Sequence, residues 1–463
     1  MVSHRLGETR TIRPVSSASS QPRRHRPPRL AVIGLDGTPF PLLKALTEGG
    51  YCPNLAALLK VGDCKQTHSS RPPLSSVAWT SFATACNPGR HGIFGFIDRR
   101  PNPLETYIPT AADRKASPWW EPISRAGGRV FILNCPGNYP PQPVNGLIVA
   151  GFEAPNLEKA TFPAAYLPQL EAWGYLVDAD VHLGHQDRAA FARQLTQVID
   201  GRFRAYLGLL DAEPWEVALC VCKETDLLHH FFWADWEAQS GWGFDYFLAT
   251  YRQIDGYIGQ ALDRFDATTE LALLADHGFC RLHAEVYVND WLREQGWFVA
   301  GPRHNPGTLD PAAGTRAYAL AGGRVYVNLR GREATGEVTS EQFEPVMHEL
   351  SAALAAWTHP ERGERVFAGV RRGLDAYEGP YAHLAADLLP DWQRGYDLRG
   401  THPHGQVFAA GAFSGMHSVD DAFLYVRGRT LRDGLIMLHD VGATVAALGG
   451  VTMPGADGRS ALV

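Results

Sequence analysis

Short apolar runs alternate along the chain with longer segments of helical periodicity. The runs at 30–35, 217–222 and 271–275 are almost continuously apolar, which is typical of strands buried on both faces of a parallel sheet. Amphipathic helical segments at 187–210 and 246–265 each lead into one of these runs. This β-α-β alternation predicts an α/β fold, a doubly wound and mostly parallel sheet with helices on both faces.

Weaker patterns fill in the remaining elements. Further strands are expected at 129–134, 147–151 and 422–426, and helices at 40–47, 54–59, 77–85 and 441–448. Between 281 and 400 the alternation gives way to short strands (286–288, 324–329) and turns rich in glycine and arginine, which indicates an inserted cap region. The sequence therefore predicts four parts: a tail (1–29), a first part of the core (30–280), a cap (281–400) and a C-terminal part of the core (401–463).

The first 29 residues differ from the rest in charge. They carry seven arginines and one acid, although the whole chain has a net charge of −6. We expect a disordered basic tail, with a tether to an anionic surface as the alternative. No apolar run follows the arginines, so neither a secretory signal nor a membrane-spanning segment is expected. Because the remainder is acidic, no nucleic-acid partner is expected.

Composition indicates the class of protein and the cellular compartment. A chain of 463 residues with 45% hydrophobic and 20% charged residues can bury a large core, as globular enzymes do. Its seven cysteines are odd in number and lack the spacing of a disulfide framework, so we expect a reducing, cytoplasmic environment. Nothing in the sequence indicates an oligomeric state.

Acidic and imidazole side chains follow the predicted strands. Asp276-His277-Gly278 comes directly after the run at 271–275, and Asp36 follows the run at 30–35. Side chains in such positions meet at the carboxyl edge of a parallel sheet. Together with an acid and two histidines near other predicted elements, these side chains provide three carboxylates and three imidazoles. That is a ligand set for two zinc-like ions. The candidate ligands are Asp36, Asp226, His230, Asp276, His277 and His417.

Several of these assignments have alternatives. Asp226 and His230 stand four residues apart, which suits chelation from one helix face but also an ordinary surface ion pair. His229 is the second choice for His230. Two further histidines, His402 and His404, compete with His417.

A hydroxyl group precedes the helix expected at 77–85. Ser75 or Ser76 would lie beside the free backbone N–H groups of the first turn, where a phosphate can be anchored. A simple N-cap is the alternative role for either serine.

The chain resembles the alkaline phosphatase superfamily, and within it the type I phosphodiesterase/nucleotide pyrophosphatase branch. The matching motifs occur in family order and extend from about residue 30 to the end. They are Gly34-Leu-Asp-Gly37, Pro72-Pro-Leu-Ser-Ser76 with Asn87-Pro-Gly-Arg-His-Gly-Ile93, Thr225-Asp-Leu-Leu-His-His230, Ala275-Asp-His-Gly278, Gly415-Met-His417 and Asp440-Val-Gly-Ala-Thr444.

The resemblance implies an alkaline phosphatase-like core and a role for each candidate. One divalent ion would be held by Asp36, Asp276 and His277, and a second by Asp226, His230 and His417. Ser75 aligns with the family's nucleophilic Thr or Ser, which also contacts metal, and Ser76 remains the alternative. The ions are expected to be zinc, with manganese possible.

The resemblance also implies a small-molecule phosphoester substrate. We expect hydrolysis through a phospho-serine intermediate, of phosphodiester or nucleotide pyrophosphate type. A phosphomonoesterase, or a phosphoryl transferase or mutase of the same superfamily, is the alternative. Nucleotide pyrophosphatase relatives bind a phosphate oxygen with an Asn after His-Gly-Ile, but this chain has Phe94-Gly-Phe96 there. Either that contact is absent, or Arg99 or Lys223 supplies it.

Overall fold

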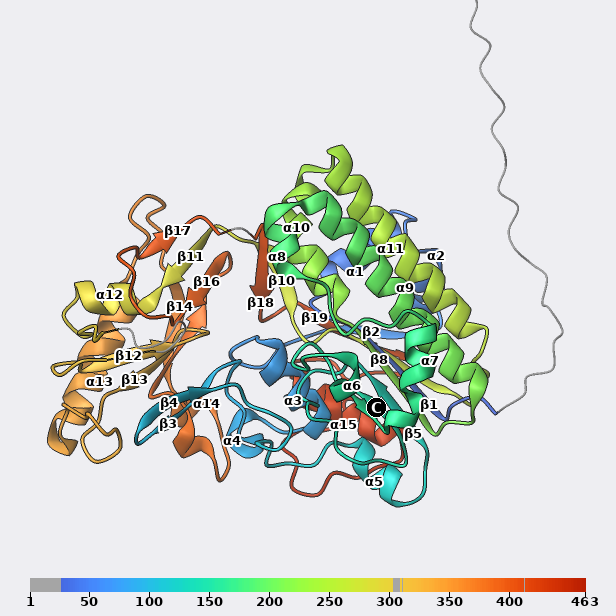
Figure 1. Cartoon of the computed structure of the whole chain (residues 1–463), viewed down its shortest axis with the longest axis horizontal. Helices are drawn as coiled ribbons and strands as arrows, with labels where there is room; N and C mark the ends of the chain where they lie inside the picture. The colour runs from blue at the N-terminus through green and yellow to red at the C-terminus, as the bar shows by residue number, and fades with distance from the viewer. Residues whose placement is uncertain (1–25, 303–308, 310, 412) are drawn as a thin grey trace, which may run out of the picture.

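The computed structural model describes residues 26–302, 309, 311–411 and 413–463. These residues form a large α/β body, the core, and a smaller body, the cap (Figure 1). Most of the predicted basic tail, residues 1–25, lies outside the described residues.

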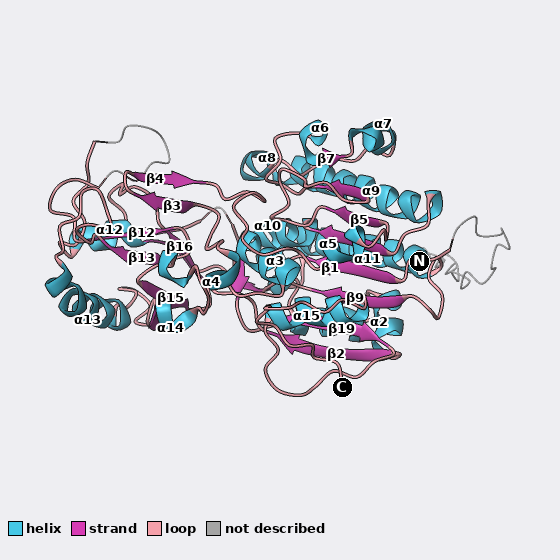
Figure 2. Ribbon diagram, turned by 90° about the horizontal axis from the view of Figure 1, so that it is seen from below, coloured by secondary structure: helices cyan, strands magenta, loops and turns pink. Residues whose placement is uncertain are grey.

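An eight-stranded sheet forms the centre of the core, in the order β2-β19-β9-β1-β8-β5-β6-β7 (Figure 2). Strands β9, β1, β8, β5 and β6 pair in parallel, whereas β19 and β7 pair antiparallel with their neighbours. The predicted mostly parallel α/β sheet is confirmed. The strands are β1 (Leu30–Leu35), β2 (Gly62–Thr67), β5 (Val130–Leu133), β6 (Gly146–Val149), β7 (Thr161–Phe162), β8 (Val217–Cys222), β9 (Glu270–Leu274) and β19 (Ala422–Arg427).

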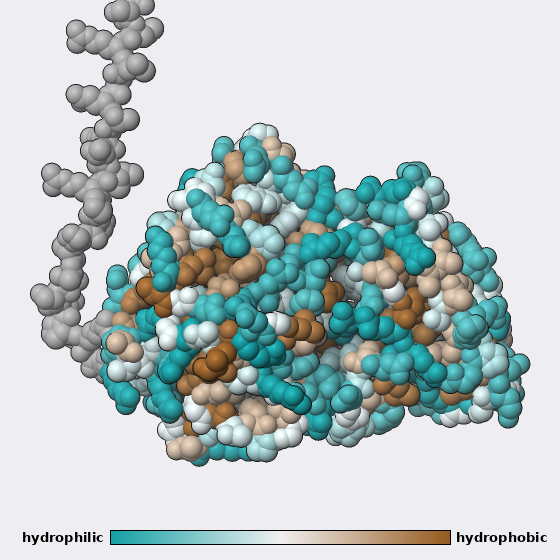
Figure 3. Space-filling view, turned by 180° about the vertical axis from the view of Figure 1, so that it is seen from behind, coloured by the Kyte–Doolittle hydropathy of each residue, from teal (hydrophilic) through white to brown (hydrophobic). Residues whose placement is uncertain are grey.

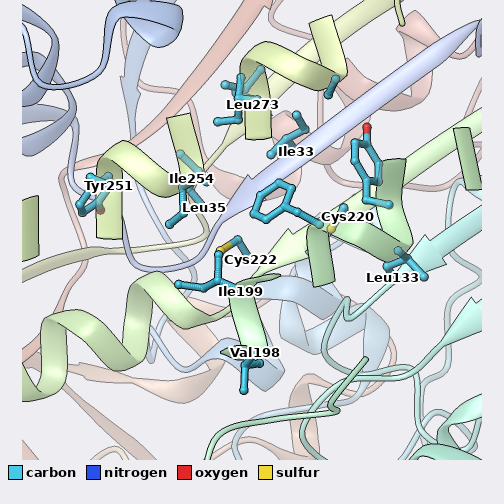
Figure 4. Packing of buried hydrophobic residues seen from close by; sticks show 14 of the residues in the cluster. Ile33, Leu35, Leu133, Val198, Ile199, Cys220, Cys222, Tyr251, Ile254 and Leu273 are labelled. Atoms are coloured by element: carbon cyan, nitrogen blue, oxygen red, sulfur yellow. The ribbon is translucent and has the colours of Figure 1, made fainter. Parts of the chain in front are cut away.

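Two hydrophobic clusters cover the two faces of this sheet. In β1, Ala31, Ile33 and Leu35 belong to one cluster, and the alternate residues Leu30 and Val32 belong to the other. Figure 4 shows part of the first cluster, where β1 and β8 pack against α9 and α11. Helices on this face are α1 (Phe40–Glu48), α2 (Pro53–Leu59), α9 (Arg188–Ala212), α10 (Glu224–Ala238) and α11 (Gly241–Leu262), and those on the other are α3 (Ser75–Thr84), α5 (Trp120–Arg125) and α15 (Leu438–Leu448).

Short helices complete the core, and an antiparallel ribbon joins it to the cap. The ribbon pairs β10 (Gly278–Arg281) with β18 (Gly415–Ser418). The short helices are α4 (Pro88–His91), α6 (Leu157–Ala160), η1 (Ala164–Tyr166), α7 (Leu167–Ala172) and α8 (Val181–Gln186).

The cap has a hydrophobic cluster of its own. One sheet has the order β12-β13-β15-β14 and another the order β16-β11-β17. The elements are β11 (Ala284–Tyr287), α12 (Val288–Glu294), β12 (Ala317–Leu320), β13 (Arg324–Val327), α13 (Ser340–Ala356), β14 (Phe367–Arg372), α14 (Gly373–Ala376), η2 (Ala382–Leu384), β15 (Leu388–Trp392), β16 (Tyr396–Arg399) and β17 (Phe408–Ala409).

A hairpin from the N-terminal half of the chain packs against the cap. Its strands are β3 (Asp98–Pro101) and β4 (Leu104–Tyr107). Arg324 of the cap pairs with Asp98 at 2.5 Å, and Arg99 pairs with Glu333 at 2.9 Å. The structure thus places a segment that we had grouped with the core against the cap.

The molecular surface is mainly hydrophilic on the face shown in Figure 3, with scattered apolar patches. Among the described residues, no helix combines the length and the apolar character needed to span a bilayer.

Candidate metal centre

The candidate ligands converge at the carboxyl edge of the sheet. Strand β1 lies between β8 and β9, with Leu35 opposite Cys222 and Gly34 opposite Leu274. Asp36 therefore leaves the sheet beside Asp276, which follows β9, and beside the first turn of α10. Adjacent parallel strands bring together residues that are hundreds of positions apart in the sequence.

Asp36, Asp276 and His277 form one buried group of potential ligands. The indole N–H of Trp79 donates to Asp36 Oδ2 at 2.9 Å, and the Gly37 N–H donates to Asp276 Oδ1 at 3.1 Å. The other oxygens, Asp36 Oδ1 and Asp276 Oδ2, are buried and have no hydrogen-bond partner among the described residues. They lie 3.5 and 3.4 Å from His277 Nε2.

A second group lies next to the first. His417 Nε2 lies 3.0 Å from Asp226 Oδ1 and 3.2 Å from His230 Nε2. The ring centroid of His277 lies 3.8 Å from that of His417, and Asp226, His277 and His417 also satisfy the distances of a metal-binding group. His277 thus belongs to both groups geometrically.

The three candidate imidazoles present the same nitrogen to the site. The Nδ1 atoms of His277, His230 and His417 hydrogen-bond to the carbonyl oxygens of Gly278, Gly415 and Pro73, at 3.1, 3.0 and 2.7 Å. A carbonyl accepts only from a protonated Nδ1, so each Nε2 of a neutral ring keeps its lone pair for a metal. Together with the unpartnered carboxylate oxygens, this nitrogen and oxygen donor set fits divalent cations of the zinc type.

Burial sets the electrostatics of the first group. Burial and the nearby carboxylates of Asp276 and Asp226 raise the pKa of Asp36 well above its usual range, and burial raises the pKa of Asp276 to about 7. Burial and the adjacent His417 lower the pKa of His277 well below its usual range. A bound cation would relieve the repulsion between the carboxylates and favour their ionised form.

Charge pairing dominates in the second group. Burial opposes ionisation of Asp226, but His230 and His417 beside it lower its pKa below the usual range. Burial likewise opposes a charge on His417, yet its hydrogen bond to Asp226 raises its pKa overall. Burial lowers the pKa of His230 to about 4.

Ser75 is the hydroxyl that contacts this centre. It is the first residue of α3, and its Oγ lies 3.4 Å from His277 Nε2. Ser76 Oγ is buried without a hydrogen-bond partner among the described residues. Neither serine is the N-cap, because Leu74 holds that position.

The alternative histidines lie elsewhere or use both ring nitrogens. His229 Nδ1 lies 2.9 Å from the Gly37 carbonyl oxygen, and its Nε2 lies 2.8 Å from the Tyr251 hydroxyl. His404 binds Asp290 of the cap through its backbone N–H. His402 packs near Phe298, which is also in the cap.

The two candidate phosphate contacts occupy different environments. Lys223 Nζ binds Asp178 Oδ2 at 2.8 Å; burial opposes its charge, but Asp178 and Asp226 raise its pKa overall. Arg99 instead binds Glu333, and its guanidinium lies 4.0 Å from the Tyr326 ring centroid. Lys223 is therefore electrostatically coupled to the centre, whereas Arg99 binds within the cap interface.

Trp79 is a supporting residue that we did not identify from the sequence. A Cβ on Gly34 would lie 2.4 Å from the Trp79 ring, so glycine is required where this side chain crosses β1. The spacing of four residues from Ser75 puts Trp79 on the same face of α3. That spacing is the available signal, but it does not reveal the contact with Asp36.

A comparison with protein-family models gives a match over most of the chain. The family model described as type I phosphodiesterase/nucleotide pyrophosphatase matches residues 30–419. Curated protein sequences give no significant match.

Solved structures with low sequence identity share the fold. Phosphonoacetate hydrolase from Sinorhizobium meliloti 1021, in complex with phosphonoacetate, has a TM-score of 0.59 at 16% identity, covering 92% of this chain and 97% of that chain. An inactive form of murine ectonucleotide pyrophosphatase/phosphodiesterase 5, in complex with AMP, has a TM-score of 0.55 at 12% identity, covering 94% and 100%.

Proposed function

We propose that this chain, which belongs to the type I phosphodiesterase/nucleotide pyrophosphatase family, hydrolyses a phosphodiester or pyrophosphate bond through an ester of Ser75. The observation that carries the proposal is the position of Ser75 Oγ, 3.4 Å from His277 Nε2 at the edge of the buried ligand groups. We assign Asp36, Asp276 and His277 to one ion and Asp226, His230 and His417 to the other, with His277 close to both. Zinc is the preferred metal, and manganese accepts the same donors.

Bound divalent ions would lower the pKa of a coordinated hydroxyl and neutralise charge that develops on phosphoryl oxygens. The chain itself positions the reacting groups. Ser75 Oγ attacks phosphorus in line, the bond to the leaving oxygen breaks, and a phospho-serine ester forms; water then attacks phosphorus and releases Ser75. The backbone N–H groups of the first turn of α3 point toward a phosphate held there. We propose Lys223 as a further contact to a phosphate oxygen, because Asp178 and Asp226 raise its pKa and it immediately precedes α10, which carries Asp226 and His230.

Metal removal and two serine variants test this assignment. We expect about two divalent ions per chain, and loss of turnover after chelation. Ser75→Ala should abolish turnover, because it deletes the attacking atom, and should leave the metal content unchanged, because the six carboxylate and imidazole ligands remain. Ser76→Ala is the matched control and should be much milder. Full activity in a metal-free preparation, or the reverse order of the two serines, would contradict the assignment.

Substrate preference follows from charge. A monoester dianion carries more charge than a diester and calls for an additional cationic contact. Among the described residues, two groups satisfy metal-binding distances, Asp36 with Asp276 and His277, and Asp226 with His277 and His417, and no third group is found there. We expect higher kcat/KM for bis-p-nitrophenyl phosphate or a nucleotide p-nitrophenyl ester than for p-nitrophenyl phosphate. A monoester preference of about tenfold, about 1.4 kcal/mol in transition-state binding, would indicate a phosphatase instead.

A further inference from the structure

A cavity of about 520 Å³ adjoins the candidate metal centre at His417. The core contributes Arg71 to its wall, and the cap contributes Arg371 and Asp391. We propose that this cavity binds an anionic group, a phosphate or a carboxylate, on the leaving-group side of the substrate. This inference rests on the proposed function and specifies the class of substrate.

Two arginines share one carboxylate in this cavity. Asp391 Oδ1 accepts a hydrogen bond from Nε of Arg71 at 3.0 Å, and Nε of Arg371 donates to Oδ1 and Oδ2 at 3.0 and 2.8 Å. Among the described residues, both guanidinium groups make hydrogen bonds through Nε and none through Nη. Their Nη groups can therefore donate to a ligand, and two guanidiniums against one carboxylate leave one net positive charge. Arginine offers such paired donors to phosphate and carboxylate.

A salt bridge that only joined the core to the cap would not need the second arginine. Arg71 and Asp391 alone would connect the core to the cap. Arg371 lies in the same sheet of the cap as Asp391, so it adds no contact between the two bodies. Its side chain is 51% exposed, whereas that of Asp391 is 18% exposed. The neighbouring Arg394, by contrast, is neutralised by Asp420 and Asp421, at 2.7 Å from each.

His417 connects the cavity to the residues around Ser75. Ser75 Oγ lies 3.4 Å from His277 Nε2, and the ring of His417, which also lines the cavity, stacks on that of His277 with 3.8 Å between centroids. In-line displacement places the leaving oxygen opposite the attacking Ser75. A leaving group that extends past His417 would enter the cavity. Arg71 is held at this point because the Pro73 carbonyl binds His417, and the Tyr377 hydroxyl donates to the Arg71 carbonyl oxygen.

Matched substrates and neighbouring arginines test the inference. The substrates are methyl aryl phosphodiesters whose phenol leaving group carries a para carboxylate, a para phosphonate or a neutral carboxamide. The measured quantity is the ratio of kcat/KM for each anionic diester to that for the neutral one, which cancels differences between enzyme preparations. Arg371→Met and Arg71→Met are compared with Arg372→Met, whose arginine follows Arg371 in β14 but pairs with Glu344 at 2.7 Å.

We expect Arg371→Met and Arg71→Met to lower the ratio about tenfold, about 1.4 kcal/mol, and Arg372→Met to leave it unchanged. The anionic diester with the larger fall identifies phosphate or carboxylate as the preferred group. Suppose that the wild-type protein turns over the neutral diester and that this turnover depends on Ser75. An unchanged ratio in Arg371→Met would then overturn this inference and leave the proposed function standing. Absence of any diester turnover by the wild-type protein would overturn the proposed function and the inference together.

Discussion

Hydrogen bonds from neighbouring segments hold the candidate ligands in place. Asp36 and Asp276 could be found from the sequence because each follows a buried strand. Their partners could not, because Trp79 reaches Asp36 only after α3 has packed across β1. Such contacts depend on tertiary packing, whereas the acid at the end of a strand is a local signal. The same holds for His417, whose carbonyl partner belongs to Pro73.

Replacing Trp79 by Phe should weaken metal binding. The change removes the N–H that orients Asp36 Oδ2, and loss of such a supporting hydrogen bond lowers metal affinity by about 10-fold or more. Trp119→Phe is the control, because Trp119 is equally buried and its Nε1 has no hydrogen-bond partner among the described residues. Competition with a chromophoric chelator measures both dissociation constants for Zn²⁺. Equal loss in the two variants would assign the effect to packing.

Metal binding should release protons in a pH-dependent way. Burial raises the pKa of Asp276 to about 7, so this carboxyl is mostly protonated at about pH 6 and mostly ionised at about pH 8, and a metal requires the ionised form. Ionisation of Asp276 should therefore make metal affinity rise as pH increases through about 7. Calorimetry in buffers of different ionisation enthalpy should show more proton release at about pH 6 than at about pH 8. Equal proton release at the two pH values would contradict this role for Asp276.

At the scale of elements, buried central strands and long helices could be predicted, and edges could not. Strands β1, β8 and β9 are continuously apolar, so the sequence located them within a residue. β2 (Gly62–Thr67) is a polar edge strand and carries no such signal. The helix expected from residue 246 begins at Gly241 instead, because glycine and aromatic residues, which have low helix propensity, hide its start.

Helix α10, which carries Asp226 and His230, is anchored by a buried ion pair. Arg202 of α9 binds Glu224 through Nε and Nη2, at 3.1 and 2.5 Å, and both side chains are 0% exposed. Arg202→Met would leave the Glu224 charge unpaired, which should cost about 3–5 kcal/mol of stability. Arg204→Met removes an exposed pair on the same helix and should change stability by less than about 0.5 kcal/mol. Urea unfolding, with the metal removed by a chelator, measures the change in stability of each variant. Equal unfolding midpoints for Arg202→Met and Arg204→Met would show that the buried pair does not anchor α10.

At the scale of the whole molecule, the core and the cap have separate hydrophobic clusters. All six candidate ligands and Ser75 come from core segments or from the β10–β18 ribbon, and the cap contributes to the neighbouring cavity instead. The sequence indicated the cap as a break in the β-α-β pattern. Its sheets could not be predicted, since they pair short strands that are distant in sequence, such as β13 with β15.

Metal addition should therefore protect the core more than the cap. A ligand that binds only the folded core raises the free energy of opening for the segments that hold it. Hydrogen exchange followed by mass spectrometry, with zinc and with chelator, should show slower exchange in β1, β8, β9 and the first turns of α10. Exchange in β12, β13 and β15 should change little, because these strands belong to the cap cluster. In Asp276→Ala the zinc effect should disappear from β1 and β9, since one carboxylate of the first group is lost. Equal protection of both bodies would mean that core and cap open as one cooperative unit, with the metal centre stabilising the whole.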